Sequence, residues 1–98
     1  METLKTSTKK QFFENNPEYL RMIKELPHGS ASIIREKVIL SYGEEFSYTL
    51  PYIRMVLDVN NTRMNRKILN VAVGYVTQLR IEEAKIMAIC NDTKNNMQ

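Results

Sequence analysis

The chain has few of the residues that build covalent or metal-bound frameworks. Its 98 residues include one cysteine, one histidine and no tryptophan. The lone cysteine, Cys90, excludes an internal disulfide and a cysteine-rich zinc site, and the lone histidine, His28, excludes a zinc finger. The sequence therefore predicts a fold that depends on its apolar core, with no metal and no other cofactor.

Long apolar runs are missing as well. No segment approaches the roughly 18 consecutive apolar residues that a transmembrane helix requires. The first residues, METLKTSTKKQ, lack the apolar centre of a signal peptide. The sequence therefore predicts a soluble, cytoplasmic protein with no membrane partner.

Catalytic motifs are also absent. The sequence has no glycine-rich phosphate loop, no H-E-x-x-H motif and no serine in a nucleophile elbow. His28 stands between a proline and a glycine, a setting typical of a loop residue rather than a general base. The pairs Glu44-Glu45 and Glu82-Glu83 are adjacent in sequence, and adjacent side chains on a helix point apart. We therefore expect no enzymatic activity and no catalytic residues.

What is present is a modestly basic chain long enough for one domain. The net charge is +3 and the isoelectric point is about 9.1, which mildly favours an anionic partner. Composition divides the chain into three parts. We expect a polar N-terminal arm over residues 1–15, a single helical domain over residues 16–90 and a polar tail over residues 91–98.

Helical spacing of apolar residues dominates the central part. Asn16 and Pro17 are typical of a helix start, and the helix that follows is expected to end near Leu26. A second helix begins at Ser30, and its end has two interpretations. Either it runs to about Tyr42 and is followed by a loop, or a separate short helix spans residues 40–46. The expected buried stripe of this region comprises Ile33, Ile34, Val38 and Leu40.

The next two helices are better defined. Thr49 is a typical cap for a helix over residues 49–58, whose inner face would carry Ile53 and Val56. A polar loop follows, and then a long last helix is expected to run to about Cys90. No segment alternates as a half-buried strand does. The sequence thus predicts a compact all-α domain of four or five helices, with a central helix-turn-helix and a long C-terminal helix.

The segment from Tyr42 to Asp58 has the spacing of a helix-turn-helix, in which a first helix ends near Phe46 with Gly43 inside it. We therefore predict a sequence-specific protein that binds double-stranded DNA and regulates transcription, with the helix at 49–58 as recognition helix. The predicted DNA-binding residues are six on that helix and three basic residues after it: Thr49, Leu50, Pro51, Tyr52, Arg54, Met55, Arg63, Arg66 and Lys67.

An alternative interpretation fits the same segment. Leu50, Pro51 and Met55 are apolar where base-reading residues are usually polar, and acidic residues flank the helix. These features suit a non-catalytic protein–protein interaction module on a helix-turn-helix-like scaffold that no longer binds DNA. Both interpretations stay open at the level of sequence.

The last helix extends beyond what a small core needs. Ile81, Ile86 and Ile89 follow the part expected to pack on the domain, and their apolar side chains require a partner surface. The sequence therefore predicts a homodimer formed through the C-terminal helix.

Four stretches resemble a known family. They are L-P-H-G at Leu26–Gly29, I-I-R-E-K at Ile33–Lys37, P-Y-I-R-M-V-L-D at Pro51–Asp58 and N-R-K-I-L-N-V-A at Asn65–Ala72. Together they resemble small lambda-repressor-like helix-turn-helix proteins of bacterial phages and mobile elements, of the kind common in Bacteroidetes. The resemblance spans residues 26–76 and implies an all-α DNA-binding domain with a role in transcription. The stretch between Ile34 and Tyr48 is several residues longer than the family pattern, and Ser47 stands where a glycine commonly makes the turn.

Overall fold

The last helix is the longest element of the described chain. The computed structural model describes the backbone of residues 8–96 and the side chains of residues 8–90. Within that range it contains five α-helices, one 3-10 helix and no strand, which confirms the all-α prediction. The elements in order are α1 (Thr8–Asn15), α2 (Pro17–Lys24), α3 (Ser30–Tyr42), the 3-10 helix η2 (Glu44–Phe46), α4 (Leu50–Leu57) and α5 (Arg66–Asn96).

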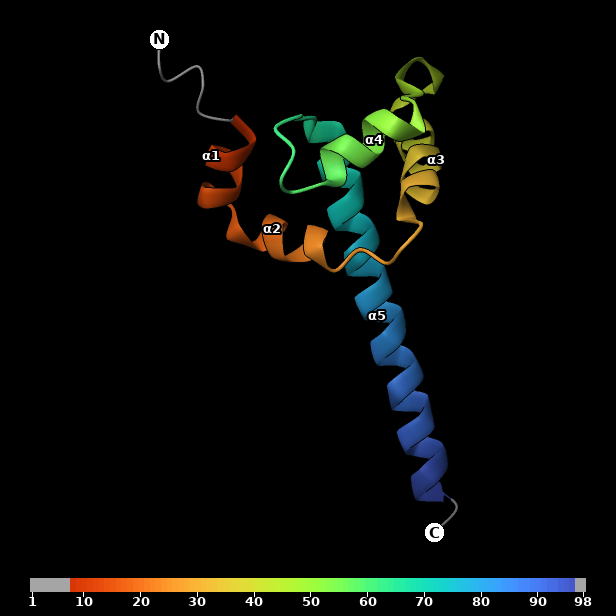
Figure 1. Cartoon of the computed structure of the whole chain (residues 1–98). Helices are drawn as coiled ribbons and strands as arrows, with labels where there is room; N and C mark the ends of the chain where they lie inside the picture. The colour runs from red at the N-terminus through yellow and green to blue at the C-terminus, as the bar shows by residue number, and fades with distance from the viewer. Residues whose placement is uncertain (1–7, 97–98) are drawn as a thin grey trace.

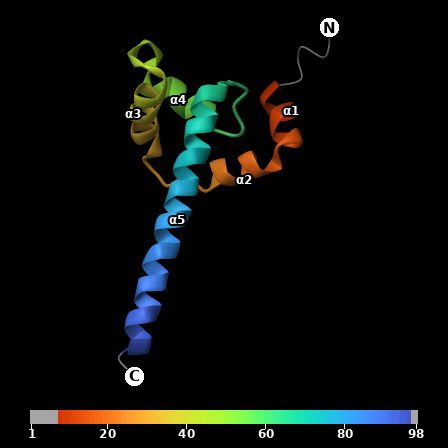
Figure 2. The same ribbon diagram turned by 180° about the vertical axis from the view of Figure 1, so that it is seen from behind.

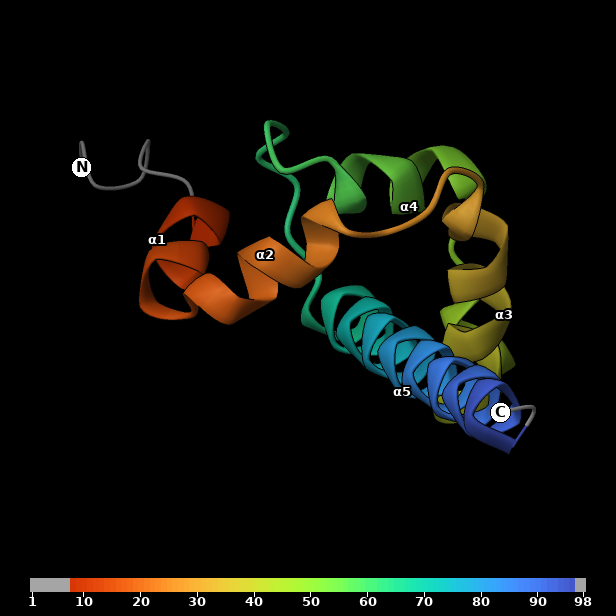
Figure 3. The ribbon, with the colours of Figure 1, turned by 90° about the horizontal axis from the view of Figure 1, so that it is seen from below.

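The first half of α5 runs between two helix pairs, with α1 and α2 on one side and α3 and α4 on the other (Figures 1 and 2). Seen from below, α2, α3, α4 and α5 surround a central core (Figure 3). We call this part, residues 8–80, the head. The second half of α5 projects away from it, which explains extents of 67 × 31 × 20 Å.

The core lies where α3, α4 and α5 meet. A helix of eight residues such as α4 is unstable alone, so this core is what holds it in place. The predicted inner residues of α4 are confirmed, since Ile53 and Val56 are fully buried. The other apolar residues with no more than 1% exposure are Ile34, Val38, Ile68, Leu69, Ala72 and Val76.

Two residues of α3 that the sequence predicted to be buried are exposed instead. Leu40 is 85% exposed and Ile33 is 41% exposed. Successive residues of a helix are rotated by about 100°, so Leu40 lies about 160° around the helix from the buried Val38. Both side chains therefore lie on the surface of the head.

Residues 8–15, which the sequence predicted to be part of a polar arm, form helix α1 instead. Two aromatic residues of α1 hold it against the rest of the head. Phe13 is 6% exposed and belongs to the core, and Phe12 packs edge-on against Tyr19 with ring centroids 5.0 Å apart. Asn16 does not cap α2 with its side chain, because its amide donates instead to the Phe12 carbonyl at 2.9 Å. The first seven residues of the predicted arm lie outside the described part.

Helix α3 follows the first of the two sequence interpretations and ends at Tyr42. Gly43 has a φ of +112°, a conformation that glycine adopts readily and other residues rarely do, so it terminates α3 instead of lying inside a helix. The expected helix end near Phe46 is therefore wrong, and residues 44–46 form a separate 3-10 turn.

Helix α5 leaves the head at an ion pair. The Arg80 guanidinium donates to both carboxylate oxygens of Glu25, at 3.1 and 2.5 Å, just after α2 ends. Hydrogen bonding to Arg80 lowers the pKa of Glu25 below its usual value. All residues from 81 to 90 are exposed, and α5 continues to Asn96, beyond the predicted end near Cys90.

Over residues 8–96, none of the helices combines the length and the apolar character that crossing a bilayer requires.

Candidate nucleic-acid interface

Helix α4 is fixed to α3 at its start and along its inner face. The predicted cap is confirmed, since the Thr49 hydroxyl accepts a hydrogen bond from the Tyr52 N–H at 3.3 Å. The preceding turn is held by Arg35 of α3, whose Nε donates to the Tyr48 carbonyl at 2.8 Å. With Ile53 and Val56 buried beneath it, α4 has one defined orientation on the head.

Four of the six residues predicted to contact DNA from α4 and its cap are exposed. Thr49, Pro51 and Arg54 are exposed, and Met55 is 40% exposed. Leu50 is half-buried and packs against the core. Pro51, Arg54 and Met55 lie within about 100° of one another around the helix and form its outer face, whereas Thr49 is exposed at its N-terminal cap.

Tyr52 lies on another side of α4. Its hydroxyl accepts a hydrogen bond from the Asn65 amide at 3.3 Å, and its ring lies 5.2 Å from that of Tyr48. At about 100° per residue, Tyr52 and Arg54 are about 160° apart around the helix. Tyr52 thus joins α4 to the start of α5 and does not share the outer face.

The basic residues at the start of α5 are spread over two sides of the head. The Arg66 guanidinium lies 4.5 Å from the Phe12 ring centroid, facing α1. The Lys67 ammonium lies 4.9 Å from the Phe46 ring centroid, facing η2. These cation–π contacts fix both charges on aromatic surfaces while Arg66 stays exposed.

Arg54 and Arg63 lie elsewhere. Arg54 lines a shallow groove with the segment that joins α2 to α3, including Pro27 and His28. Arg63 is exposed in the loop before α5, where its N–H donates to the Asn61 side chain at 2.8 Å. The structure therefore does not bring Arg54 together with Arg66 and Lys67 into one continuous cationic strip.

Two residues that sequence reasoning missed determine how α4 is held. Asn65 accepts a hydrogen bond from the Ile68 N–H at 3.1 Å, which caps α5, and also donates to Tyr52. Lys9 of α1 is 1% exposed, and its ammonium donates to the carbonyls of Met55 and Asp58 at 3.3 and 2.7 Å. The asparagine before a helical pattern is a recognisable cap signal. The lysine gives no such signal.

The buried position of Lys9 shifts the pKa of its ammonium group. Burial lowers the pKa of the Lys9 ammonium, and the nearby Asp58 carboxylate opposes that shift in part. Carbonyl groups at the C-terminal end of a helix carry partial negative charge, so the ammonium is favourably placed against α4. Helix α1 thereby supports the end of α4 opposite its Thr49 cap.

We expect Asn65→Ala to lower the free energy of unfolding by about 1–2 kcal/mol, because it removes the cap of α5 and the contact with Tyr52. Asn65→Asp keeps the capping oxygen and should stay within about 0.5 kcal/mol of the parent. Urea unfolding followed by circular dichroism measures both. Equal losses in the two variants would show that the cap does not matter.

No protein-family model, no curated protein and no solved structure matches this chain. The assignment of a function therefore depends on the geometry described above.

Proposed function

We propose that the protein binds double-stranded DNA in a sequence-specific manner and regulates transcription, with α4 as recognition helix. The observation that carries the proposal is the outer face of α4. It is a short helix whose inner face is locked on α3 and α5, while Thr49, Arg54 and Met55 project outward. A helix presented in this way after a turn can enter the major groove.

The outer face suits the edges of bases. An arginine such as Arg54 can donate two hydrogen bonds to O6 and N7 of guanine, and an apolar group such as Met55 can pack on a thymine methyl. The Thr49 hydroxyl keeps its own hydrogen for donation while it caps the helix. Arg63 and Arg66 would contact phosphates beside the groove, where they add affinity without sequence preference.

The proposal includes a homodimer formed through α5. A set of residues separated alternately by three and four positions runs along one face of α5, which we call the α5 seam: Leu69, Ala72, Val76, Leu79, Glu83, Ile86 and Cys90. Its first three members are buried in the head, while Ile86 is 61% exposed and Cys90 is exposed. This heptad spacing is that of a coiled coil, and a second copy would cover its exposed end.

A specific observation favours a second candidate, a non-catalytic protein–protein interaction module. Leu40 and Ile33 are exposed on α3, together with Tyr42 at 37%, and Met55 adds a fourth apolar side chain on α4. Exposed apolar residues of this kind suit a protein partner. The separation of Arg54 from the other basic residues points in the same direction.

A retardation experiment with mixed-sequence duplex DNA separates the two functions. We expect the protein to retard DNA at low salt and to release it near about 0.3 M salt, because neutralised phosphates release counterions. Arg54→Glu combined with Arg63→Glu should weaken binding by at least about tenfold. Both side chains are exposed, so the fold should be retained.

The matched control is Lys85→Glu, which also reverses an exposed charge but lies on the projecting half of α5. It should retain most of the binding. If the parent protein fails to retard DNA at low salt, or if the control loses as much affinity as the α4 variant, α4 is not a recognition helix and the protein-interaction function is favoured.

A further inference from the structure

The start of α4 has an arginine beside it that the proposed function does not yet use. Arg35 lies on α3, and its Nε donates to the carbonyl of Tyr48 at 2.8 Å. Tyr48 directly precedes Thr49, the residue that caps α4. The hydrogen bond joins residues 13 positions apart, and it therefore fixes the Arg35 guanidinium at the N-terminal end of α4.

The anchored guanidinium keeps most of its hydrogen-bonding capacity. An arginine has five N–H donors, one on Nε and the rest on the two Nη atoms, and the Tyr48 carbonyl takes the first. Over residues 8–90, a buried or half-buried residue has no side-chain nitrogen or oxygen atom that is both shielded from solvent and without a hydrogen-bond partner. Arg35 is half-buried, and its Nη atoms have neither a hydrogen bond nor an ion pair within that range. Both Nη atoms are therefore open to solvent.

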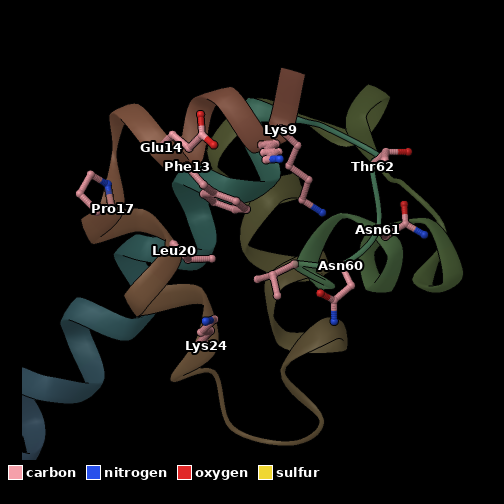
Figure 4. Close-up of a pocket in the computed structure, with 11 residues that line it drawn as sticks. Lys9, Phe13, Glu14, Pro17, Leu20, Lys24, Asn60, Asn61 and Thr62 are labelled. Carbon is pink, nitrogen blue, oxygen red and sulfur yellow. The ribbon is translucent and has the colours of Figure 1, made fainter. Parts of the chain in front are cut away.

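A buried lysine at the other end of α4 shows the opposite case. Lys9 lines the pocket that α1 and α2 form with the loop after α4 (Figure 4). It is 1% exposed, and its ammonium donates to the carbonyls of Met55 and Asp58. A ligand cannot reach that ammonium, so Lys9 supports the fold. Arg35 differs because a backbone carbonyl holds one side of its guanidinium and leaves the other side open.

The place of the open side suits a phosphate of the DNA backbone. Helix α4 carries its arginine, Arg54, in its last turn, and Arg63 and Arg66 follow the helix, so these charges lie toward its C-terminal end. Arg35 is bound to the turn before α4 and not to the outer face, so it would meet the backbone beside the groove and not the base edges within it. Two Nη groups match two oxygens of a phosphate, which gives a bidentate, charge-assisted contact.

We propose that Arg35 is a further DNA-binding residue, whose Nη groups clamp a backbone phosphate at the N-terminal end of α4. The inference rests on the proposed DNA-binding function and adds to it a contact at the end of the helix opposite Arg63 and Arg66. Cationic contacts at both ends would fix the direction of α4 along the groove. The hydrogen bond to Tyr48 holds the guanidinium in place before DNA binds, which reduces the side-chain entropy lost on binding.

The test separates the open side of the guanidinium from its anchored side. The amide nitrogen of glutamine is as many bonds from Cα as Nε of arginine is, so Arg35→Gln can still donate to Tyr48 but lacks both Nη groups and the charge. Retardation of mixed-sequence duplex DNA over a series of salt concentrations should show about tenfold weaker binding at low salt. The slope of log affinity against log salt should fall by about one phosphate contact. The urea unfolding midpoint should equal that of the parent.

The matched control is Lys37→Gln, which removes a positive charge from the same helix. The Lys37 ammonium lies over the Tyr75 ring and donates to Gln78, on the side of α3 that faces α5. This variant should bind DNA within about twofold of the parent, with an unchanged salt slope. If the parent binds DNA but Arg35→Gln keeps its slope, or if both variants weaken binding equally, the Arg35 contact is wrong and the DNA-binding function stands. If the parent does not bind DNA, both are wrong.

Protection from phenylglyoxal, a reagent that modifies accessible guanidinium groups, tests the same contact in the unaltered chain. Mass spectrometry should find Arg35 modified in the free protein and protected when duplex DNA is bound. Arg21, which is exposed and pairs with Glu18 on α2, should react equally in both samples. If DNA does not slow the modification of Arg35, the contact is overturned, whether or not Arg35→Gln keeps its fold.

Discussion

Replacing Ile53 by alanine is expected to lower the free energy of unfolding by about 2–5 kcal/mol. Ile53 has no exposed surface and lies in the core where α4 packs on α3 and α5. Its removal leaves a cavity that short helices can only partly close. Since small domains are stabilised by only about 5–15 kcal/mol in total, the loss is a large share of that stability. Urea unfolding followed by circular dichroism measures it.

The matched control lies two positions along the same helix. Met55 is 40% exposed, so Met55→Ala removes a similar volume of side chain with much less buried contact. We expect it to cost no more than about 1 kcal/mol. If the two variants lost equal stability, the inner face of α4 would be assigned to the wrong residues, and the outer face proposed for DNA would be wrong with it.

Replacing Ile86 by lysine is expected to convert a homodimer into a monomer. Ile86 continues the α5 seam beyond the head and is 61% exposed in the single chain. In a coiled coil this position would be buried against the second copy, and an unpaired ammonium there is strongly unfavourable. Sedimentation at concentrations on the order of tens of micromolar should show a dimer for the parent and a monomer for the variant.

Loss of the dimer should also weaken binding to DNA that carries two half-sites, by about a hundredfold, because one complex no longer presents two copies of α4. The control is Ile81→Lys, the same substitution at a residue that is 51% exposed but lies off the seam, on the opposite face of α5. It should leave the dimer intact. If the parent protein sediments as a monomer, or if Ile81→Lys disrupts the dimer as much as Ile86→Lys does, the α5 seam is not the dimer interface.

The parts of the fold that the sequence predicted are those determined by local signals. Thr49 caps α4, and the spacing of Ile53 and Val56 defines its buried face, because both effects act within one or two turns of helix. The long α5 followed from an extended apolar periodicity in the same way. Four of the six residues proposed to contact DNA from α4 and its cap are exposed for this reason.

The features that the sequence did not reveal depend on contacts between distant residues. The hydrogen bond between Asn65 and the Tyr52 hydroxyl joins α4 to the start of α5, a contact between elements that helical periodicity does not reveal. Arg66 and Lys67 are neighbours in sequence, but they lie on aromatic rings of different elements, Phe12 of α1 and Phe46 of η2. The polar composition of residues 8–15 likewise hid a helix, because its two phenylalanines matter more than its charges.

The contacts of Lys9 have a consequence for the order in which the protein folds. They join α1 to residues that are 46 and 49 positions away. Closing so long a loop costs chain entropy before any contact compensates for it, whereas α3 and α4 meet through a short connection. Helix α2 contacts α5 over 51 and 55 positions, so we expect α1 to dock together with α2 after α3 and α4 have paired. The contacts of α1 would then act mainly on the rate of unfolding, so the N-terminal helix determines the lifetime of the folded state more than the speed of its formation.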